Sequence, residues 1–205
     1  SNLVEDGLSL DELVISLAGV KLATPPGKLY SYQNVAYSLI EPIMYTTTSK
    51  TFEVNLKERI FTPLGMEDAS ANFLDMQNSP NAATPHLPTR YSYVPKRLSP
   101  AYYNVAAAGG INASISDMSQ WLRALLGYRP DVIPKQVLDK VFSPAVRTPL
   151  MNRYYRKWLG ARRAYYGLGW RIVPLENDTI VYHGGYANGF KSHVALDRKQ
   201  DIAIC

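Results

Sequence analysis

The sequence has a single cysteine, Cys205, which is the last of its 205 residues. An intrachain disulfide is therefore excluded, and with it the class of small secreted proteins that disulfides hold together. Long hydrophobic runs are also missing, because proline, glycine or charge interrupts each apolar stretch before the roughly 18 to 20 residues that a membrane-spanning helix needs. The chain is nevertheless 46% hydrophobic and 19% charged, which excludes a disordered or low-complexity polymer. We expect a folded globular protein.

Several motifs for catalysis and ligand binding are absent as well. The chain contains no G-x-S-x-G, H-E-x-x-H, C-x-x-C or G-x-G-x-x-G. Its three histidines, His86, His183 and His193, are too scattered for a metal-site signature. No neighbouring residue supplies Cys205 with a base or a positive field. We therefore expect no metal and no cofactor.

Helical patterns dominate the first part of the chain. Ser9 and Glu12 form an S-x-x-E capping box ahead of leucines at helical spacing. Four further helices are expected: one from Val35, one over 51–60, one with Ser116 as its cap, and one over 135–142. Many prolines between about 68 and 100 favour a long structured loop there.

The end of the chain has the patterns of strands. These are expected over 170–173, 179–182, 190–196 and 201–205, joined as hairpins. Helices followed by an antiparallel meander indicate an α+β fold. About four strands facing a helical lobe would leave one face of the sheet poorly covered. We therefore expect 1–205 to be a single domain that is incomplete at both ends, with a mostly helical lobe over about 1–165 and antiparallel strands over about 166–205.

A net charge of +5 would permit an anionic partner. The positive charge is concentrated in one segment without acidic residues, where aromatic residues are interleaved: Arg153, Arg156, Lys157, Arg162 and Arg163. That composition occurs in nucleic-acid contacts. A solvated loop whose aromatic rings pack inward explains it equally simply and is the interpretation we favour. Nucleic-acid binding is the minor alternative.

Two short segments have the residue types of a catalytic site. In the first, the Tyr32 phenol and the Asn34 carboxamide are two residues apart at the start of an expected helix. In the second, His183-Gly184-Gly185-Tyr186 places an imidazole and two glycines at the end of an apolar strand. Taken alone, Tyr32 could equally be a packed tyrosine, and the glycines an ordinary bulge or turn.

Five ordered segments together carry a resemblance. They are Tyr32-Gln33-Asn34, I-F-T-P-L-G-M at 60–66, A-A-G-G-I at 107–111, Y-G-L-G-W at 166–170 and His183-Gly184-Gly185. With them, nearly the whole chain resembles the serine β-lactamase and penicillin-binding-protein-like superfamily. The similar branch holds class C β-lactamases, D-Ala-D-Ala carboxypeptidases and related esterases. The resemblance implies a β-lactamase/transpeptidase-like fold and acyl transfer through a serine.

The resemblance also implies roles for particular residues. Tyr32 matches a tyrosine that relays protons, and Asn34 an amide that binds a substrate carbonyl and a catalytic lysine. His183 stands where many members have the lysine of K-T-G. Gly184 and Gly185 leave room for substrate beside the strand, and the Tyr186 backbone N–H would be an oxyanion-hole donor. Because an imidazole is at most partly charged at neutral pH, it would bind a carboxylate weakly, and we do not expect efficient β-lactam hydrolysis.

The family's nucleophile is missing from the sequence. It lies in an S-x-x-K upstream of the tyrosine, and this chain has no S-x-x-K. Its nearest approach, Thr47 to Lys50, falls after Tyr32, so we interpret it as a helix end. We expect an inactive fragment of an extracytoplasmic bacterial serine hydrolase that acts on peptidoglycan-type D-amino-acid peptides, small esters or amides. The alternative is a non-catalytic ligand-binding relative. Uncovered strands would favour self-association.

Overall fold

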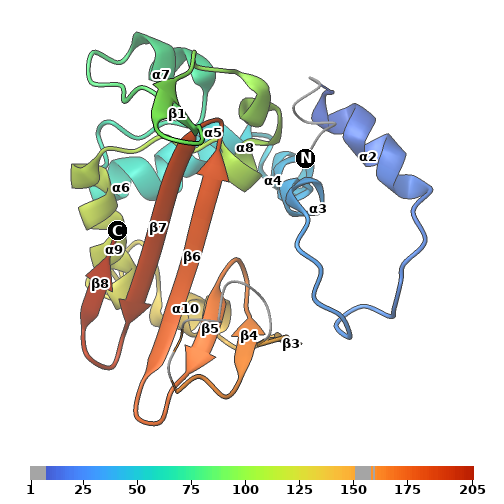
Figure 1. Ribbon diagram of the computed structural model, residues 1–205, viewed down its shortest axis with the longest axis vertical. Coiled ribbons are helices and arrows are strands. Elements are labelled where there is room, and N and C mark those ends of the chain that lie inside the picture. The colour runs from blue at the N-terminus through green and yellow to red at the C-terminus, as the bar shows by residue number, and fades with distance from the viewer. Residues whose placement is uncertain (1–7, 151–157, 159) are drawn as a thin grey trace. The chain divides into compact units, whose positions relative to one another are not determined.

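The computed structural model of the protein describes residues 8–150, 158 and 160–205. Arg153, Arg156 and Lys157, the first three cations of the basic segment, lie outside the described residues, whereas Arg162 and Arg163 are exposed. Helices dominate the regular structure of the described chain up to Val141, and strands follow from Val146 (Figure 1). None of the described helices is long and apolar enough to cross a bilayer.

The described chain divides into two compact units. Unit 1 takes its residues from Ser1–Lys21, Gln33–Met118 and Gly185–Lys191, and unit 2 from Leu22–Tyr32, Ser119–Gly184 and Ser192–Cys205. The helical elements, including the π-helix η1 and the 3₁₀-helix η2, are α2 (Leu10–Ala18), α3 (Asn34–Ser38), α4 (Ile40–Thr48), α5 (Phe52–Leu56), η1 (Lys57–Phe61), α6 (Thr62–Leu64), α7 (Phe73–Asn78), η2 (Ala101–Val105), α8 (Ala106–Gly109), α9 (Ile115–Leu126) and α10 (Lys135–Val141).

The expected capping box at the first helix is confirmed. The Ser9 backbone N–H donates to a Glu12 carboxylate oxygen at 2.8 Å, and the Glu12 N–H donates to Ser9 Oγ at 3.4 Å. Two amide donors at the start of α2 are thereby satisfied. Leu13, which follows the box, is 1% exposed and packs with Val105 in the core of unit 1.

The helix α9 begins with a different cap from the one expected. The Asp117 N–H donates to Ser114 Oγ at 3.2 Å, and the Ser114 N–H donates to a carboxylate oxygen of Asp117 at 3.0 Å. The prediction of Ser116 as the cap was wrong, because Ser114 and Asp117 have the three-residue spacing that lets each side chain bond the other's amide. Gly127 follows the helix with φ +102°, as a residue after a helix end often does.

The segment 60–66 ends the third expected helix in unit 1. Gly65 adopts φ +70°, and the Met66 N–H donates to the Phe61 carbonyl at 2.9 Å. This left-handed turn satisfies carbonyls that the ended helix leaves free. Phe61, Leu64 and Met66 are all buried at this turn.

The long segment between 68 and 100 contains regular structure. Besides α7 it forms a two-stranded antiparallel hairpin of β1 (His86–Pro88) and β2 (Tyr93–Pro95), with Leu87 opposite Val94. All six residues of these strands are exposed. The His86 N–H at the base of the hairpin donates to the Gly189 carbonyl at 3.0 Å.

Among the described residues the sheet has six strands, two more than expected. In spatial order they are β3 (Val146–Thr148), β4 (Ala164–Tyr166), β5 (Arg171–Pro174), β6 (Thr179–Ala187), β7 (Phe190–Asp197) and β8 (Ile202–Ile204). The pairs β3–β4, β4–β5, β5–β6 and β7–β8 are antiparallel. Figure 1 shows β6 and β7 as the two long strands. The added strands β3 and β4 are three residues each, too short for an alternating pattern to be recognised.

The strand β6 extends five residues beyond the expected 179–182. It ends at a two-residue turn of Asn188 and Gly189, which have φ +49° and +90°. A two-residue hairpin turn with positive φ at both positions strongly favours Asn-Gly. His183, Gly184, Gly185 and Tyr186 therefore lie inside a strand, and the expectation that they end one was wrong.

Candidate active site

Aromatic rings from two segments of unit 2 gather beside His183. Tyr32 stacks on the imidazole with a centroid distance of 5.9 Å and an interplanar angle of 27°. Tyr166, the last residue of β4, places its hydroxyl 3.3 Å from His183 Nε2. Tyr30 contacts the Tyr166 ring at 4.8 Å between centroids. The structure thus brings together two predicted site residues, Tyr32 and His183, that are far apart in the sequence.

Arg171, the first residue of β5, lies against this cluster. It is 3% exposed, and its Cζ lies 5.6 Å from the Tyr32 ring centroid and 5.8 Å from that of Tyr166. A guanidinium over an aromatic face is attracted by the ring's quadrupole. Sequence reasoning missed Arg171. The only local signal was its position directly after Y-G-L-G-W, which does not reveal that two tyrosine rings cover it.

The surroundings of His183 keep its imidazole neutral. Burial, and secondly the charge of Arg171, lower the pKa of His183 from its ordinary 6.5 to about 4. At neutral pH the ring can therefore offer one hydrogen-bond donor and one acceptor, but no positive charge. The expectation that a histidine here binds a carboxylate weakly stays a prediction.

Gly184 lies under a side chain from the neighbouring strand. A Cβ atom placed on Gly184 would lie 2.5 Å from Nδ1 and 2.7 Å from Cε1 of His193 on β7. Such distances are shorter than any real carbon contact, so an alanine requires His193 to move. The glycine thus allows the His193 ring to cross the β6 backbone.

The remaining predicted site residues belong to unit 1. Asn34 is the first residue of α3, and its carbonyl accepts a hydrogen bond from Ser38 Oγ at 3.1 Å. Gly185 and Tyr186 continue β6 and are exposed, with 59% of Tyr186 accessible. The two units are described separately, so the cluster around His183 consists of Tyr30, Tyr32, Tyr166 and Arg171 from unit 2.

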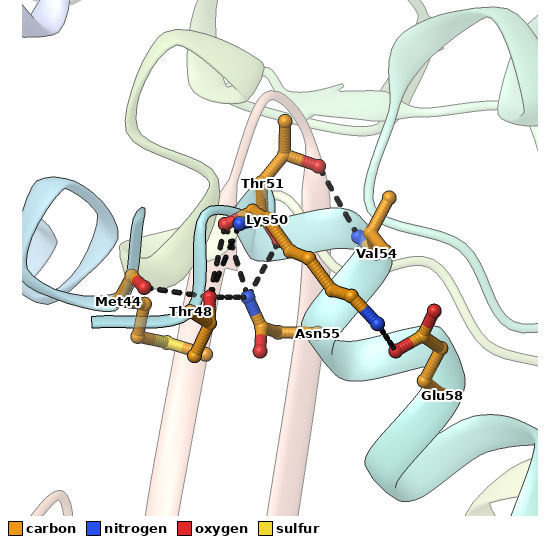
Figure 2. A network of polar contacts seen from close by, with 7 residues as sticks. All are labelled: Met44, Thr48, Lys50, Thr51, Val54, Asn55 and Glu58. Atoms are coloured by element: carbon orange, nitrogen blue, oxygen red, sulfur yellow. Dashed lines mark hydrogen bonds and ion pairs between the residues drawn. The ribbon is translucent and has the colours of Figure 1, made fainter. Parts of the chain in front are cut away.

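The T-x-x-K at 47–50 lies at the end of α4, as expected. Thr47 Oγ1 donates to the Ile43 carbonyl at 2.9 Å at the end of α4. Lys50 forms an ion pair with Glu58, and Asn55 Nδ2 donates to Thr48 Oγ1 and to the carbonyls of Lys50 and Thr51 (Figure 2). These contacts join α4 to α5, and they give Lys50 a carboxylate partner in place of a hydroxyl nucleophile.

The described residues offer no metal centre. Within them, no group of three or more histidine, cysteine, aspartate or glutamate side chains is arranged to hold an ion. The cluster around His183 consists of phenol, imidazole and guanidinium groups.

Comparison with protein families identifies the fold's relatives. The family model described as Beta-lactamase matches residues 2–205. The chain belongs to the Beta-lactamase family. Members include hydrolases by name, and the resemblance drawn from the five sequence segments is confirmed.

Three relatives show how widely the family's named activities vary. The chain is 26% identical over 205 residues to the unguisins hydrolase ungD' of Aspergillus campestris, with 96% of this chain and 36% of the relative covered. It is 29% identical over 188 residues to a D-aminopeptidase of Gluconobacter oxydans, covering 87% of this chain and 32% of the relative. It is 23% identical over 193 residues to the D-alanyl-D-alanine-carboxypeptidase/endopeptidase AmpH of Escherichia coli, covering 91% and 46%.

Solved structures confirm the fold. The octameric penicillin-binding protein homologue from Pyrococcus abyssi superposes with a TM-score of 0.82 at 20% identity, over 95% of this chain and 42% of that one. The penicillin-binding protein from Bacillus halodurans gives a TM-score of 0.71 at 18% identity, over 94% and 55%. The α+β, β-lactamase-like fold expected from the sequence is thus correct. The chain spans between about a third and a half of the length of the curated relatives described above.

Proposed function

We propose that the chain is part of a serine hydrolase that acts through an acyl-enzyme. In this chemistry a serine attacks an amide or ester carbonyl, the amine or alcohol leaves, and water then releases the acyl group. The observation that carries the proposal is the stacking of Tyr32 on a neutral His183, with the Tyr166 hydroxyl beside the imidazole. Phenol and imidazole in contact can pass a proton between a nucleophile and a leaving group.

The nucleophile and its lysine would lie in a part of the parent protein outside these 205 residues. Support comes from two facts: the sequence has no S-x-x-K, and it spans only 32% to 46% of the three relatives described above. On this proposal the chain carries Tyr32 and the His183-Gly184-Gly185 segment of β6 but cannot be acylated by itself.

The proposed roles follow the chemistry of each group. Tyr32, 46% exposed, relays protons at a position that substrate can reach. Asn34 hydrogen-bonds a substrate carbonyl and the catalytic lysine. Gly184 and Gly185 allow substrate to lie along β6, and the Tyr186 N–H is one oxyanion donor, with the serine's own N–H as its partner.

The neutral state of His183 narrows the substrate class. With its pKa lowered to about 4, the imidazole offers a hydrogen bond but no full charge to a substrate carboxylate at pH 7. We propose peptidoglycan-type D-amino-acid peptides, small esters or amides as substrates. Among them, acyl donors without a carboxylate at this position are favoured, as in D-aminopeptidase chemistry, and β-lactams are poor substrates.

Kinetics of the parent protein test the role of Tyr32. The Tyr32→Phe variant is expected to acylate with an activated ester at least about 100-fold more slowly, the usual loss for a missing proton-transfer group. Tyr45→Phe is the matched control, because Tyr45 is an exposed tyrosine of α4. Unchanged acylation in Tyr32→Phe contradicts the role.

The second candidate is a ligand-binding relative without catalysis. The missing S-x-x-K favours it if the parent sequence also lacks that motif. The candidate predicts equilibrium binding of a D-Ala-D-Ala peptide without turnover. A parent sequence that contains the motif ahead of Tyr32, together with turnover, removes it.

Two further properties belong to the proposal. An enzyme of peptidoglycan-type peptides works outside the cytoplasm, so we place the parent protein in the bacterial cell envelope. We also expect self-association through β8, an edge strand on which Ile202 and Ile204 are 59% and 64% exposed. If sedimentation velocity shows only monomer at protein concentrations up to about 100 µM, self-association is contradicted.

A further inference from the structure

Arg171 is a buried cation that the proposed mechanism does not yet use. It faces Tyr182 across the β5–β6 pair and is only 3% exposed. Removing a charge from water is unfavourable unless its new surroundings compensate. Two tyrosine faces, those of Tyr32 and Tyr166, provide part of that compensation at 5.6 and 5.8 Å.

The same two rings are the ones that contact His183. Tyr32 stacks on the imidazole, and Tyr166 meets it edge-on at 6.3 Å between centroids. Tyr32 and Tyr166 also meet each other edge-on, at 6.4 Å. Every pair among the two tyrosines and the histidine is therefore in contact, and the guanidinium touches both tyrosines.

We propose that Arg171 is a positioning residue of the active site. Its planar guanidinium holds the Tyr32 and Tyr166 rings in the orientation that places both phenols against His183. Arg171 does not contact substrate in this account, because its side chain is buried behind the tyrosines. The inference rests on the proposed function only for its effect on acylation, since the ring geometry exists independently of any reaction.

Charge and shape make separate contributions, and two substitutions separate them. Arg171→Lys keeps the positive charge but loses the planar group that lies on aromatic rings. Arg171→Gln loses both. Other titratable groups described near His183 are Tyr32 ahead of α3, Tyr166 on β4 with Tyr30 against its ring, and His193 on β7, whose ring lies over Gly184.

Histidine titration by NMR reads the charge contribution. The full chain has three histidines, so His86→Gln and His193→Gln variants assign the signals. His183 should titrate near pH 4. In Arg171→Gln we expect its pKa to rise part of the way toward 6.5, because burial remains the larger cause of the lowering. In Arg171→Lys it should stay close to the original value.

Acylation of the parent protein reads the contribution of shape. Arg171→Lys should slow acylation at least about tenfold through kcat, with KM little changed, because an unheld ring misplaces the relay group without removing a substrate contact. The matched control is Arg198→Gln, since Arg198 lies 5.6 Å over the Phe142 ring in the same unit. That variant should change neither the His183 titration nor acylation.

The outcomes distinguish this inference from the proposed function. A folded Arg171→Gln variant in which the pKa of His183 is unchanged overturns the inference about Arg171. If Arg171→Gln does not fold, Arg171→Lys decides alone, and full acylation by that variant overturns the positioning role. If Tyr32→Phe acylates normally while the His183 titration still responds to Arg171→Gln, the proposed function fails and the arrangement of charge around His183 stands.

Discussion

The contact between Gly184 and His193 predicts a measurable coupling. In Gly184→Ala the new Cβ would lie 2.5 Å from His193 Nδ1, so the imidazole must leave its position over β6. His193 is exposed, so it can turn to another rotamer or sit off-rotamer, at about 0.5 to 1.5 kcal/mol. Against this, alanine in a strand gains about 0.5 to 1 kcal/mol over glycine because the unfolded chain loses freedom.

A double-mutant cycle isolates the collision from the glycine effect. In the His193→Ala background the ring is gone, and Gly184→Ala should stabilise the chain by about 0.5 to 1 kcal/mol. In the original background the same change should lie between about 0.5 kcal/mol stabilising and about 1 kcal/mol destabilising. The coupling energy from urea unfolding should therefore be about 0.5 to 1.5 kcal/mol. Equal effects of Gly184→Ala in both backgrounds would refute the reasoning.

Three more changes have expected outcomes. Asn55→Ala should destabilise the chain by about 2 to 3 kcal/mol in urea unfolding, because Asn55 is 1% exposed and its amide donates to Thr48 and to two carbonyls. Thr47→Ala is the control: Thr47 is exposed, and its replacement should cost under about 0.5 kcal/mol. Asp117→Ala should lower the free energy of unfolding by a similar amount, about 2 to 3 kcal/mol, because the backbone amides of Ser114 and Asp68 lose a buried acceptor. A decrease below about 0.5 kcal/mol contradicts this. The folded-state pKa of His183 lies below its unfolded value, so protonation of His183 favours the unfolded chain increasingly as pH falls from 6.5 to about 4. The resulting loss in free energy of unfolding is at most about 3 kcal/mol. In acid titrations of stability, His183→Gln should lack that part of the pH dependence.

Local chemistry made the helix starts predictable, within limits. The Ser9–Glu12 box is complete within four residues, so the sequence alone specifies it. At α9 two serines compete for the cap, and the bond between Ser114 and Asp117 decides between them. The spacing that identifies Ser114 was present in the sequence and was the better guide.

The strands were predictable where their patterns are long. The strands β5, β7 and β8 lie close to their expected ranges. The end of β6 was missed although Asn188-Gly189 is the strongest short signal for a hairpin. The short strands β3 and β4 exist because of partners distant in sequence, and a three-residue segment carries no period to recognise.

The candidate site was predictable as a set of residue types but not as an environment. Tyr32 and His183 were chosen from motifs, and their stacking required the fold to bring two distant segments together. Burial of Arg171 under two tyrosine rings depends on the same packing. No local pattern around Trp170 and Arg171 distinguishes a buried arginine from an exposed one.

Intact-mass spectrometry tests the central claim most directly. The 205-residue chain and its longer parent protein would each be incubated with an activated ester and with a penicillin. The account predicts a covalent acyl adduct on the parent protein alone, formed with the ester and poorly with the penicillin. An adduct on the 205-residue chain, or none on a parent that contains S-x-x-K, would contradict it.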